Sequence, residues 1–251
     1  MASVKDHYES HLAPLYTWIA GGAAGPRARF TELLTTHRLF PSRPGATAVD
    51  LGAGSGFQSL PLAAAAGYAV TALDLSETLL AELARDAATA ALPVRTVPGD
   101  LRDLALHSPT PAPELIVCMG DTLTHLPALD DVARLFRDSA AALAPGGHLI
   151  LSFRDYTTAR HGADRFLPVR SDADRIFTCF LDFGPTHVNV HDILHLRDAS
   201  TSTWRQSIST YEKLRLSPAF VRAQLLAAGL TLTHNDLTAG LATFIARKTS
   251  A

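Results

Sequence analysis

A cluster of polar side chains follows a short apolar run near the middle of the chain. The stretch CMGDTLTHLP, residues 118–127, places a carboxylate at Asp121 and an imidazole at His125 directly after the run ELIV. An ionised aspartate only accepts hydrogen bonds, so Asp121 could hold an amine or a hydroxyl group and take its proton. The alternative is a turn or capping role for Asp121, because aspartate is frequent in turns.

A glycine-rich turn follows another apolar run, in VDLGAGSGF, residues 49–57. Glycines in such a turn let a ligand approach the backbone closely. The spacing is G-x-G-x-G, and Phe57 stands where a dinucleotide-binding fingerprint has its last glycine, which disfavours a pyrophosphate site. Asp50 adds a negative charge beside the turn and favours a cationic ligand. The glycines concerned are Gly52, Gly54 and Gly56. Alone, the motif is equally compatible with a glycine-rich turn of any α/β protein.

Two more carboxylates follow the next expected strands. Asp74 ends the strand in TALDLS and could accept hydrogen bonds from both hydroxyls of a ribose. This supports an adenosine-containing ligand without distinguishing NAD from other members of that class. Asp100, in VPGDLRDL, could accept a hydrogen bond from an adenine amino group, or it could cap a helix.

The surrounding elements can be read from the hydrophobic pattern. Strands and helices alternate from residue 46 to residue 152, which predicts a parallel sheet covered on both faces. Ser76 and Ser217 are expected helix N-caps, the latter followed by Pro218 at the first helical position. Residues 1–45 suggest two helices around the break GGAAGP.

The pattern changes after Phe153. Residues 154–173 are polar and irregular, and three β-rich runs follow without intervening helices, which predicts antiparallel pairing. The runs are RIFTCFLDF, HVNVHDILHL and STWRQSISTYEKLRL, and TLTHNDL with LATFIARK forms a closing antiparallel pair. The β-rich segment is most simply a lid inserted into a single α/β domain.

Three histidines in one of these runs do not predict a metal site. His187, His191 and His195 alternate with apolar residues, as expected for a strand. Residues four apart in a strand are separated by about 13 Å, too far to share one ion. We therefore expect no bound metal, and a solvated or pocket-facing position for these side chains.

Composition narrows the functional classes. The net charge is −2 and the arginines are scattered, which gives little support to nucleic-acid binding. The two cysteines, Cys118 and Cys179, form neither a disulfide framework nor a zinc pattern, as is typical of a reducing compartment. The N-terminus lacks the design of a signal peptide, and no apolar stretch is long enough to span a bilayer. We expect a cytoplasmic protein, with a homo-oligomer compatible with the sequence.

Taken together, the motifs resemble the class I S-adenosylmethionine-dependent methyltransferases. The matching segments are VDLGAGSG, LDLS, GDLRDL, ELIVCMG and AALAPGGHLILSF, in the order found in that superfamily. The resemblance implies a Rossmann-like α/β fold: a seven-stranded, mostly parallel sheet with one antiparallel edge strand, an antiparallel β-rich lid insertion and N-terminal helices. We expect an N-terminal helical lid (1–45), a cofactor-binding core (46–153), a substrate lid (154–216) and a C-terminal helix and strand pair completing the sheet (217–251).

The resemblance also implies a cofactor site. Gly52 and Gly54, beside Asp50 and Gly56, would lie along the methionine part of S-adenosylmethionine, and Met119 would line its sulfonium side. Asp74, with Leu75 beside it, would hold the ribose, and Asp100 with Leu101 the adenine.

Within the superfamily, the glycine N-methyltransferase-like branch is the most similar. The shared segments here are GDTLTHLP, RDYT, KLRLS and WIAGGAAGPRAR. They imply that Arg29 pairs with the cofactor carboxylate and that Arg154 binds a substrate carboxylate, for which a planar bidentate donor is suited; a surface ion pair is the alternative for Arg154. Asp121 departs from the branch, which has asparagine there, and this puts glycine itself in doubt as the substrate.

Two further residues complete the expected site. His125 is expected to hydrogen-bond a loop carbonyl and to hold its segment rigid, and Tyr156 to line the substrate pocket or to pack. The implied activity is methyl transfer, by direct displacement, to the amine nitrogen of a small carboxylate-bearing molecule. The alternatives are an O- or C-methyltransferase of a natural product and a non-catalytic cofactor-binding module.

Overall fold

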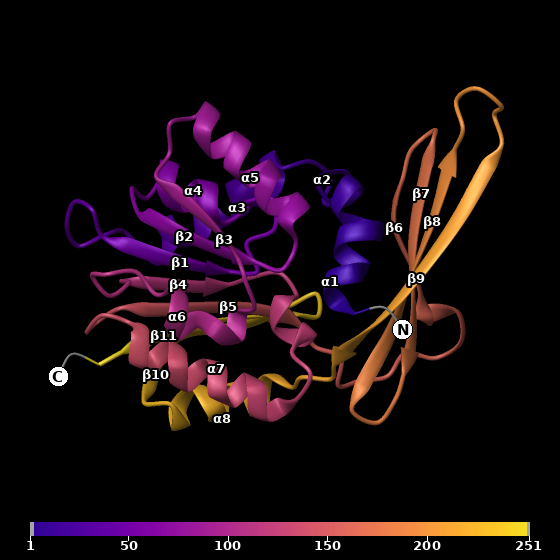
Figure 1. Ribbon diagram of the computed structural model, residues 1–251. Coiled ribbons are helices and arrows are strands. Elements are labelled where there is room, and N and C mark those ends of the chain that lie inside the picture. Colours follow the sequence, from indigo (N-terminus) through magenta and orange to yellow (C-terminus); the bar gives the residue numbers. More distant parts are fainter. Residues whose placement is uncertain (1–2, 250–251) are drawn as a thin grey trace.

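A seven-stranded sheet forms the centre of the computed structural model, which describes residues 3–249 (Figure 1). Its strand order is β10-β11-β5-β4-β1-β2-β3. All neighbours pair in parallel except at β11, which is antiparallel to both β5 and β10. The strands are β1 (Thr47–Leu51), β2 (Ala69–Asp74), β3 (Val94–Pro98), β4 (Leu115–Cys118), β5 (His148–Arg154), β10 (Leu230–Thr238) and β11 (Leu241–Lys248).

The mostly parallel sheet confirms the expected fold class, with one correction. The antiparallel strand is not at the edge, because β10 lies outside it and runs in the direction of the parallel strands. The two strands form a hairpin whose turn, Ala239 and Gly240, has positive φ angles of 50° and 77°. This is the type I′ geometry that matches the twist of a hairpin.

Helices cover both faces of this sheet. Apolar residues of α3 (Ala24–Thr36), α4 (Ser59–Ala64) and α5 (Glu77–Thr89) pack on one face. Those of α6 (Leu104–His107), α7 (Leu129–Ala142) and α8 (Pro218–Ala227) pack on the other. The two predicted N-caps are confirmed: the Ser76 and Ser217 side chains accept hydrogen bonds from the backbone N–H of Leu79 (3.2 Å) and Phe220 (3.0 Å).

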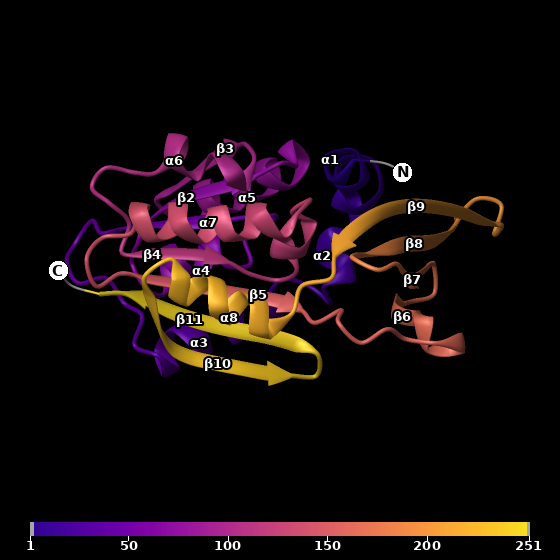
Figure 2. The same ribbon diagram turned by 90° about the horizontal axis from the view of Figure 1, so that it is seen from below.

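A second sheet, which we call the lid sheet, stands beside the first (Figure 2). It is antiparallel in the order β6-β7-β8-β9. Its strands are β6 (Phe166–Ser171), β7 (Arg175–Phe183), β8 (His187–Arg197) and β9 (Trp204–Leu214). The prediction of an irregular segment at 154–173 was wrong for β6. This exposed edge strand contains Pro168 and a register shift, so it lacks the alternating pattern that identifies a strand.

The N-terminal segment lies between the two sheets (Figures 1 and 2). It consists of α1 (Val4–His7), a π-helical turn η1 (Tyr8–Leu12), a 3-10 turn η2 (Ala13–Leu15) and α2 (Tyr16–Ile19). The first of the two predicted helices is thus broken into short pieces, because Pro14 cannot donate a backbone hydrogen bond. Leu12 packs with Phe177 and Leu194 of the lid sheet. Three further 3-10 turns, η3 (Leu101–Asp103), η4 (Thr122–His125) and η5 (Gly162–Arg165), complete the elements.

Within residues 3–249, no helix combines the length and apolarity needed to cross a membrane.

Candidate active site

A cavity of about 280 Å³ lies at the carboxyl ends of the parallel strands. We call it the strand-end cavity. The loops after β1, β2, β3 and β4 form its floor, and the N-terminal segment covers it. Its lining residues are Ser3, Val4, Lys5, Tyr8, Tyr16, Gly52, Gly54, Asp74, Leu75, Leu79, Gly99, Asp100, Leu101, Arg102, Thr122, His125, Leu126 and Pro127. Carboxyl ends of adjacent parallel strands are the usual place for ligands in open α/β sheets.

The glycine-rich turn serves two different purposes. Gly52 and Gly54 line the cavity, as predicted, and both have positive φ angles, 73° and 51°. A Cβ at Gly52 would overlap the side chain of Thr122, so the turn after β1 packs directly against the loop after β4. Gly56 does not line the cavity; a Cβ there would overlap Leu83 of α5. Its glycine is required for helix packing.

Two of the predicted carboxylates border the cavity. Asp74 accepts hydrogen bonds from the backbone N–H of Gly54 and Ser76, both 2.8 Å long, and burial raises its pKa. Its oxygens retain lone pairs for a ligand hydroxyl. Asp100 combines both expected roles, because it lines the cavity and also caps η3 through the backbone N–H of Arg102 (2.9 Å). Its carboxylate also pairs with the Arg102 guanidinium at 2.7 Å.

Asp50 lies below the turn and does not line the cavity. It is 1% exposed, and its Oδ2 accepts a hydrogen bond from the Ser59 hydroxyl at 2.6 Å. Burial raises the pKa of Asp50 to about 7. The sequence had suggested a full negative charge at Asp50 beside a cationic ligand. The structure does not support that charge, because the raised pKa leaves Asp50 partly protonated near neutral pH.

Two predicted cofactor residues lie elsewhere. Arg29 is exposed on α3 and does not border the cavity. Met119 is half-buried and packs against the core on the α3 and α4 side of the sheet. Tyr8, Tyr16 and Arg102, which were not among the predicted residues, do line the cavity. The tyrosines carried no site signal, because aromatic residues at helical spacing are more often part of a core.

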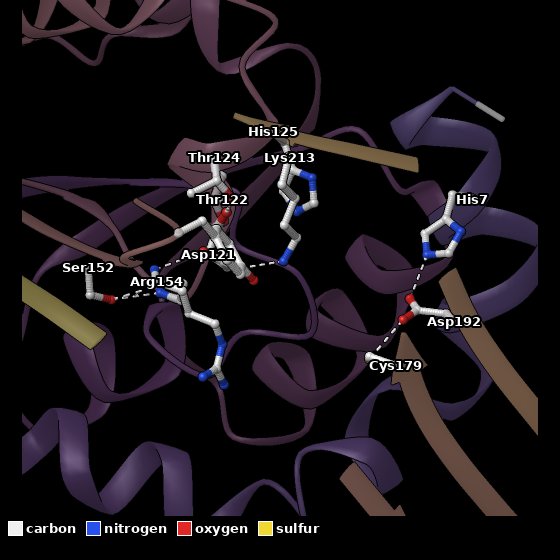
Figure 3. Close-up of polar contacts among 12 residues, drawn as sticks. His7, Asp121, Thr122, Thr124, His125, Ser152, Arg154, Cys179, Asp192 and Lys213 are labelled. Atoms are coloured by element: carbon white, nitrogen blue, oxygen red, sulfur yellow. Dashed lines mark hydrogen bonds and ion pairs between the residues drawn. The ribbon is translucent and has the colours of Figure 1, made fainter. Parts of the chain in front are cut away.

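The carboxylate of Asp121 accepts hydrogen bonds from three donors. We call Asp121 and these three donors the Asp121 cluster (Figure 3). Its Oδ1 accepts a hydrogen bond from the backbone N–H of Arg154 at 2.9 Å. Its Oδ2 accepts one from the Tyr156 hydroxyl at 3.0 Å and forms an ion pair with Lys213 Nζ. The side chains of Asp121 and Lys213 are only 15% and 9% exposed. Lys213 belongs to β9, so this ion pair joins the lid sheet to the loop after β4.

The ion pair changes the expected acid–base behaviour. Burial alone would raise the pKa of Asp121, but the charge of Lys213 and its hydrogen bond outweigh burial and lower it. Burial acts to lower the pKa of Lys213, and Asp121 outweighs it and raises that pKa well above its usual value. Asp121 is therefore an ionised carboxylate with low affinity for a proton.

His125 lines the strand-end cavity and is neutral. Its Nε2 lies 3.2 Å from the Tyr8 hydroxyl, rather than bonding a loop carbonyl as predicted. Burial lowers its pKa to about 3, with a further contribution from Lys213. Among the described residues its buried Nδ1 has no hydrogen-bond partner. The ring also stacks on Tyr211, with centroids 5.4 Å apart.

A second buried network ties the N-terminal segment to the lid sheet (Figure 3). His7 Nε2 lies 3.0 Å from Asp192 Oδ2, and its Nδ1 lies 2.7 Å from the Ser209 hydroxyl. The Cys179 thiol donates to the other oxygen of Asp192 at 2.9 Å. Because Tyr8 follows His7 directly, this network also positions a wall of the strand-end cavity.

No group of His, Cys, Asp or Glu side chains suited to a metal ion occurs in the described part of the chain. Each of the three lid histidines has a separate partner: His187 bonds the Pro127 carbonyl, His191 the Thr210 hydroxyl and His195 the Gln206 amide.

Comparison with known proteins agrees with this geometry. Residues 48–147 match a family described as Methyltransferase domain. A glycine/sarcosine N-methyltransferase from Parasynechococcus marenigrum is 30% identical over 156 residues, which cover 61% of this chain and 52% of that protein. The chain thus spans about half the length of this curated relative.

Solved structures share the fold. The CcbJ methyltransferase from Streptomyces caelestis superposes with a TM-score of 0.77, at 20% identity over 97% of this chain and 98% of that one. CalS10 from Micromonospora echinaspora, an amino pentose methyltransferase solved with bound S-adenosylmethionine, gives a TM-score of 0.70 at 18% identity, covering 89% and 90%.

Proposed function

We propose that this chain is a class I S-adenosylmethionine-dependent methyltransferase that methylates the amine nitrogen of a small, carboxylate-bearing molecule. S-adenosylmethionine supplies an electrophilic methyl group on a sulfonium. The position of the Arg154 guanidinium beside the Asp121 cluster is the main observation in support of a carboxylate-bearing methyl acceptor.

The lining of the strand-end cavity fits the cofactor. Gly52 and Gly54 line the cavity, and we assign the amino-acid part of the molecule to them; the Asp74 carboxylate retains acceptors for the ribose hydroxyls. Asp100 and Leu101 line the same cavity, and we assign them to the adenine. Tyr8 and Tyr16 line the cavity from the N-terminal segment.

Arg154 supports a carboxylate on the acceptor. It ends β5, its backbone N–H anchors Asp121, and its side chain is exposed. The guanidinium has no carboxylate partner among residues 3–249, and Figure 3 shows it directed away from Lys213. A guanidinium of this kind can bind a substrate carboxylate through two parallel hydrogen bonds. The curated relative, which is named for glycine and sarcosine, supports nitrogen as the methylated atom.

The chemistry asks little of the protein beyond alignment. Direct displacement requires a neutral amine nitrogen in line with the sulfonium, in a site without water. The low proton affinity of Asp121 argues against the proton-accepting role suggested by the sequence. We assign Asp121 to holding an N–H of the acceptor, and the amine enters already deprotonated.

The test uses labelled cofactor with glycine, sarcosine, ethanolamine and phenol as acceptors. Methyl transfer to an amino acid is expected, with little transfer to ethanolamine and none to phenol. Arg154→Ala should raise KM for the amino acid about 10- to 100-fold, the effect of losing a charge-assisted hydrogen bond, without changing cofactor affinity. Arg160→Ala, in the exposed loop that follows, is the matched control. Transfer to phenol alone, or an unchanged KM in Arg154→Ala, would refute the proposal.

A further inference from the structure

Lys213 is buried at the point where the lid sheet meets the core. The side chains of β9 alternate there, so that Tyr211 and Lys213 face inward while Glu212 is exposed. The Lys213 ammonium reaches Asp121 and lies 5.6 Å and 5.8 Å from the ring centroids of Tyr211 and Tyr156. This lysine, directed inward from a lid strand, places a positive charge next to Asp121, which directly precedes the cavity-lining residue Thr122.

Four of the groups around this pair carry no charge. Tyr8, Tyr156 and Tyr211 all have raised pKa values because they are buried, and His125 is neutral. The charges of Asp121 and Lys213 therefore cancel within the cluster, and the exposed Arg154 guanidinium lies beside it. Without Lys213 the site would carry the unpaired charge of Asp121 and would attract cations.

We infer that Lys213 determines the charge of the accepted substrate: by neutralising Asp121 it makes the site unfavourable for a cationic amine and leaves the carboxylate of the acceptor to Arg154. The inference rests on the proposed function and deepens it. Lys213 acts through Asp121 and is thus a specificity-determining, positioning residue.

The geometry explains why Asp121 cannot bind a cationic amine while Lys213 is present. Three donors already occupy its two oxygens. A protonated amine would have to displace the Lys213 ammonium or lie beside it, and like charges in a partly buried site repel strongly. A neutral amine can still donate to a remaining lone pair of the carboxylate.

Single replacements of the two partners should shift charge preference in opposite directions. The probes are methylammonium and acetate, titrated by calorimetry against the protein loaded with S-adenosylhomocysteine. Lys213→Met should tighten methylammonium binding at least tenfold and weaken acetate binding. Asp121→Asn leaves the ammonium unpaired and should tighten acetate and weaken methylammonium.

Three controls separate this effect from a loss of structure. Lys213→Arg should keep the wild-type preference between methylammonium and acetate. The double variant, Asp121→Asn with Lys213→Met, should show neither the tighter methylammonium binding nor the tighter acetate binding of the single variants. Lys248→Met removes a half-buried lysine of β11 whose ammonium, within residues 3–249, bonds backbone carbonyls alone, and this variant should bind both probes as the wild type does. If Lys213→Met does not fold, Asp121→Asn and the double variant still measure the effect.

The inference is overturned if folded single variants bind S-adenosylhomocysteine normally and keep the wild-type preference between the probes. Failure of the proposed function is a separate result, in which the wild-type protein binds the cofactor but methylates no amino acid.

Discussion

Replacing Gly52 with alanine should destabilise the protein and weaken cofactor binding more than the same change at Gly54. Both glycines border the strand-end cavity, and both have φ angles in the left-handed region. They differ in what a side chain would meet. A Cβ at Gly52 overlaps Cγ2 and Oγ1 of Thr122 and lies 2.9 Å from its Cβ, whereas a Cβ at Gly54 lies 3.5 Å from Tyr16 Cε1, an ordinary contact.

The expected magnitude follows from these contacts. A left-handed φ costs an alanine about 1–2 kcal/mol relative to glycine, and both variants incur this cost. Gly52→Ala must also displace the Thr122 side chain, whose hydroxyl donates to the Met119 carbonyl at 3.1 Å. Losing that hydrogen bond adds about 1 kcal/mol. We expect a loss of about 2–3 kcal/mol in the free energy of unfolding for Gly52→Ala and about 1–2 kcal/mol for Gly54→Ala.

Urea unfolding without cofactor measures the stability, and calorimetric titration with S-adenosylhomocysteine measures the affinity. Combining Gly52→Ala with Thr122→Ala removes the two overlapping atoms and should recover part of the lost stability relative to Gly52→Ala. Equal stability of the two glycine variants, or no recovery in the double variant, would refute the close packing of the loops after β1 and β4.

Two further predictions concern titration. Asp50 has a folded pKa of about 7, above its usual 3.8, so its stabilising contribution is complete below pH 4 and is lost as the pH rises to 7. In urea unfolding without cofactor, the wild type should lose about 1.4 kcal/mol per pH unit relative to Asp50→Asn between pH 5 and 7 and nothing above pH 8, and parallel profiles would contradict this. His125 has a pKa of about 3, so its ring proton resonances should not titrate between pH 5 and 8, and an NMR midpoint near 6.5 would show that the ring is not buried against Tyr8.

Much of the core could be predicted because its signals are local. The alternation of apolar runs and helices, and the caps at Ser76 and Ser217, depend on residues a few positions apart. β6 could not be predicted, since an exposed edge strand with a proline has no hydrophobic pattern. The position of β11 within the sheet depends on strand pairing, which the order of elements along the chain does not specify.

The same division applies to the candidate site. The sequence by itself predicted a ligand site at the carboxyl ends of the strands, and Gly52, Gly54, Asp74 and Asp100 line one cavity there, because each belongs to a turn attached to one strand. Tertiary structure decided the rest. Asp121 meets Lys213 across 92 residues, and His7 meets Asp192 across 185. Whether a buried carboxylate is a base or half of an ion pair depends on a partner brought to it by folding, because a neighbouring charge at contact distance outweighs the intrinsic pKa of either residue.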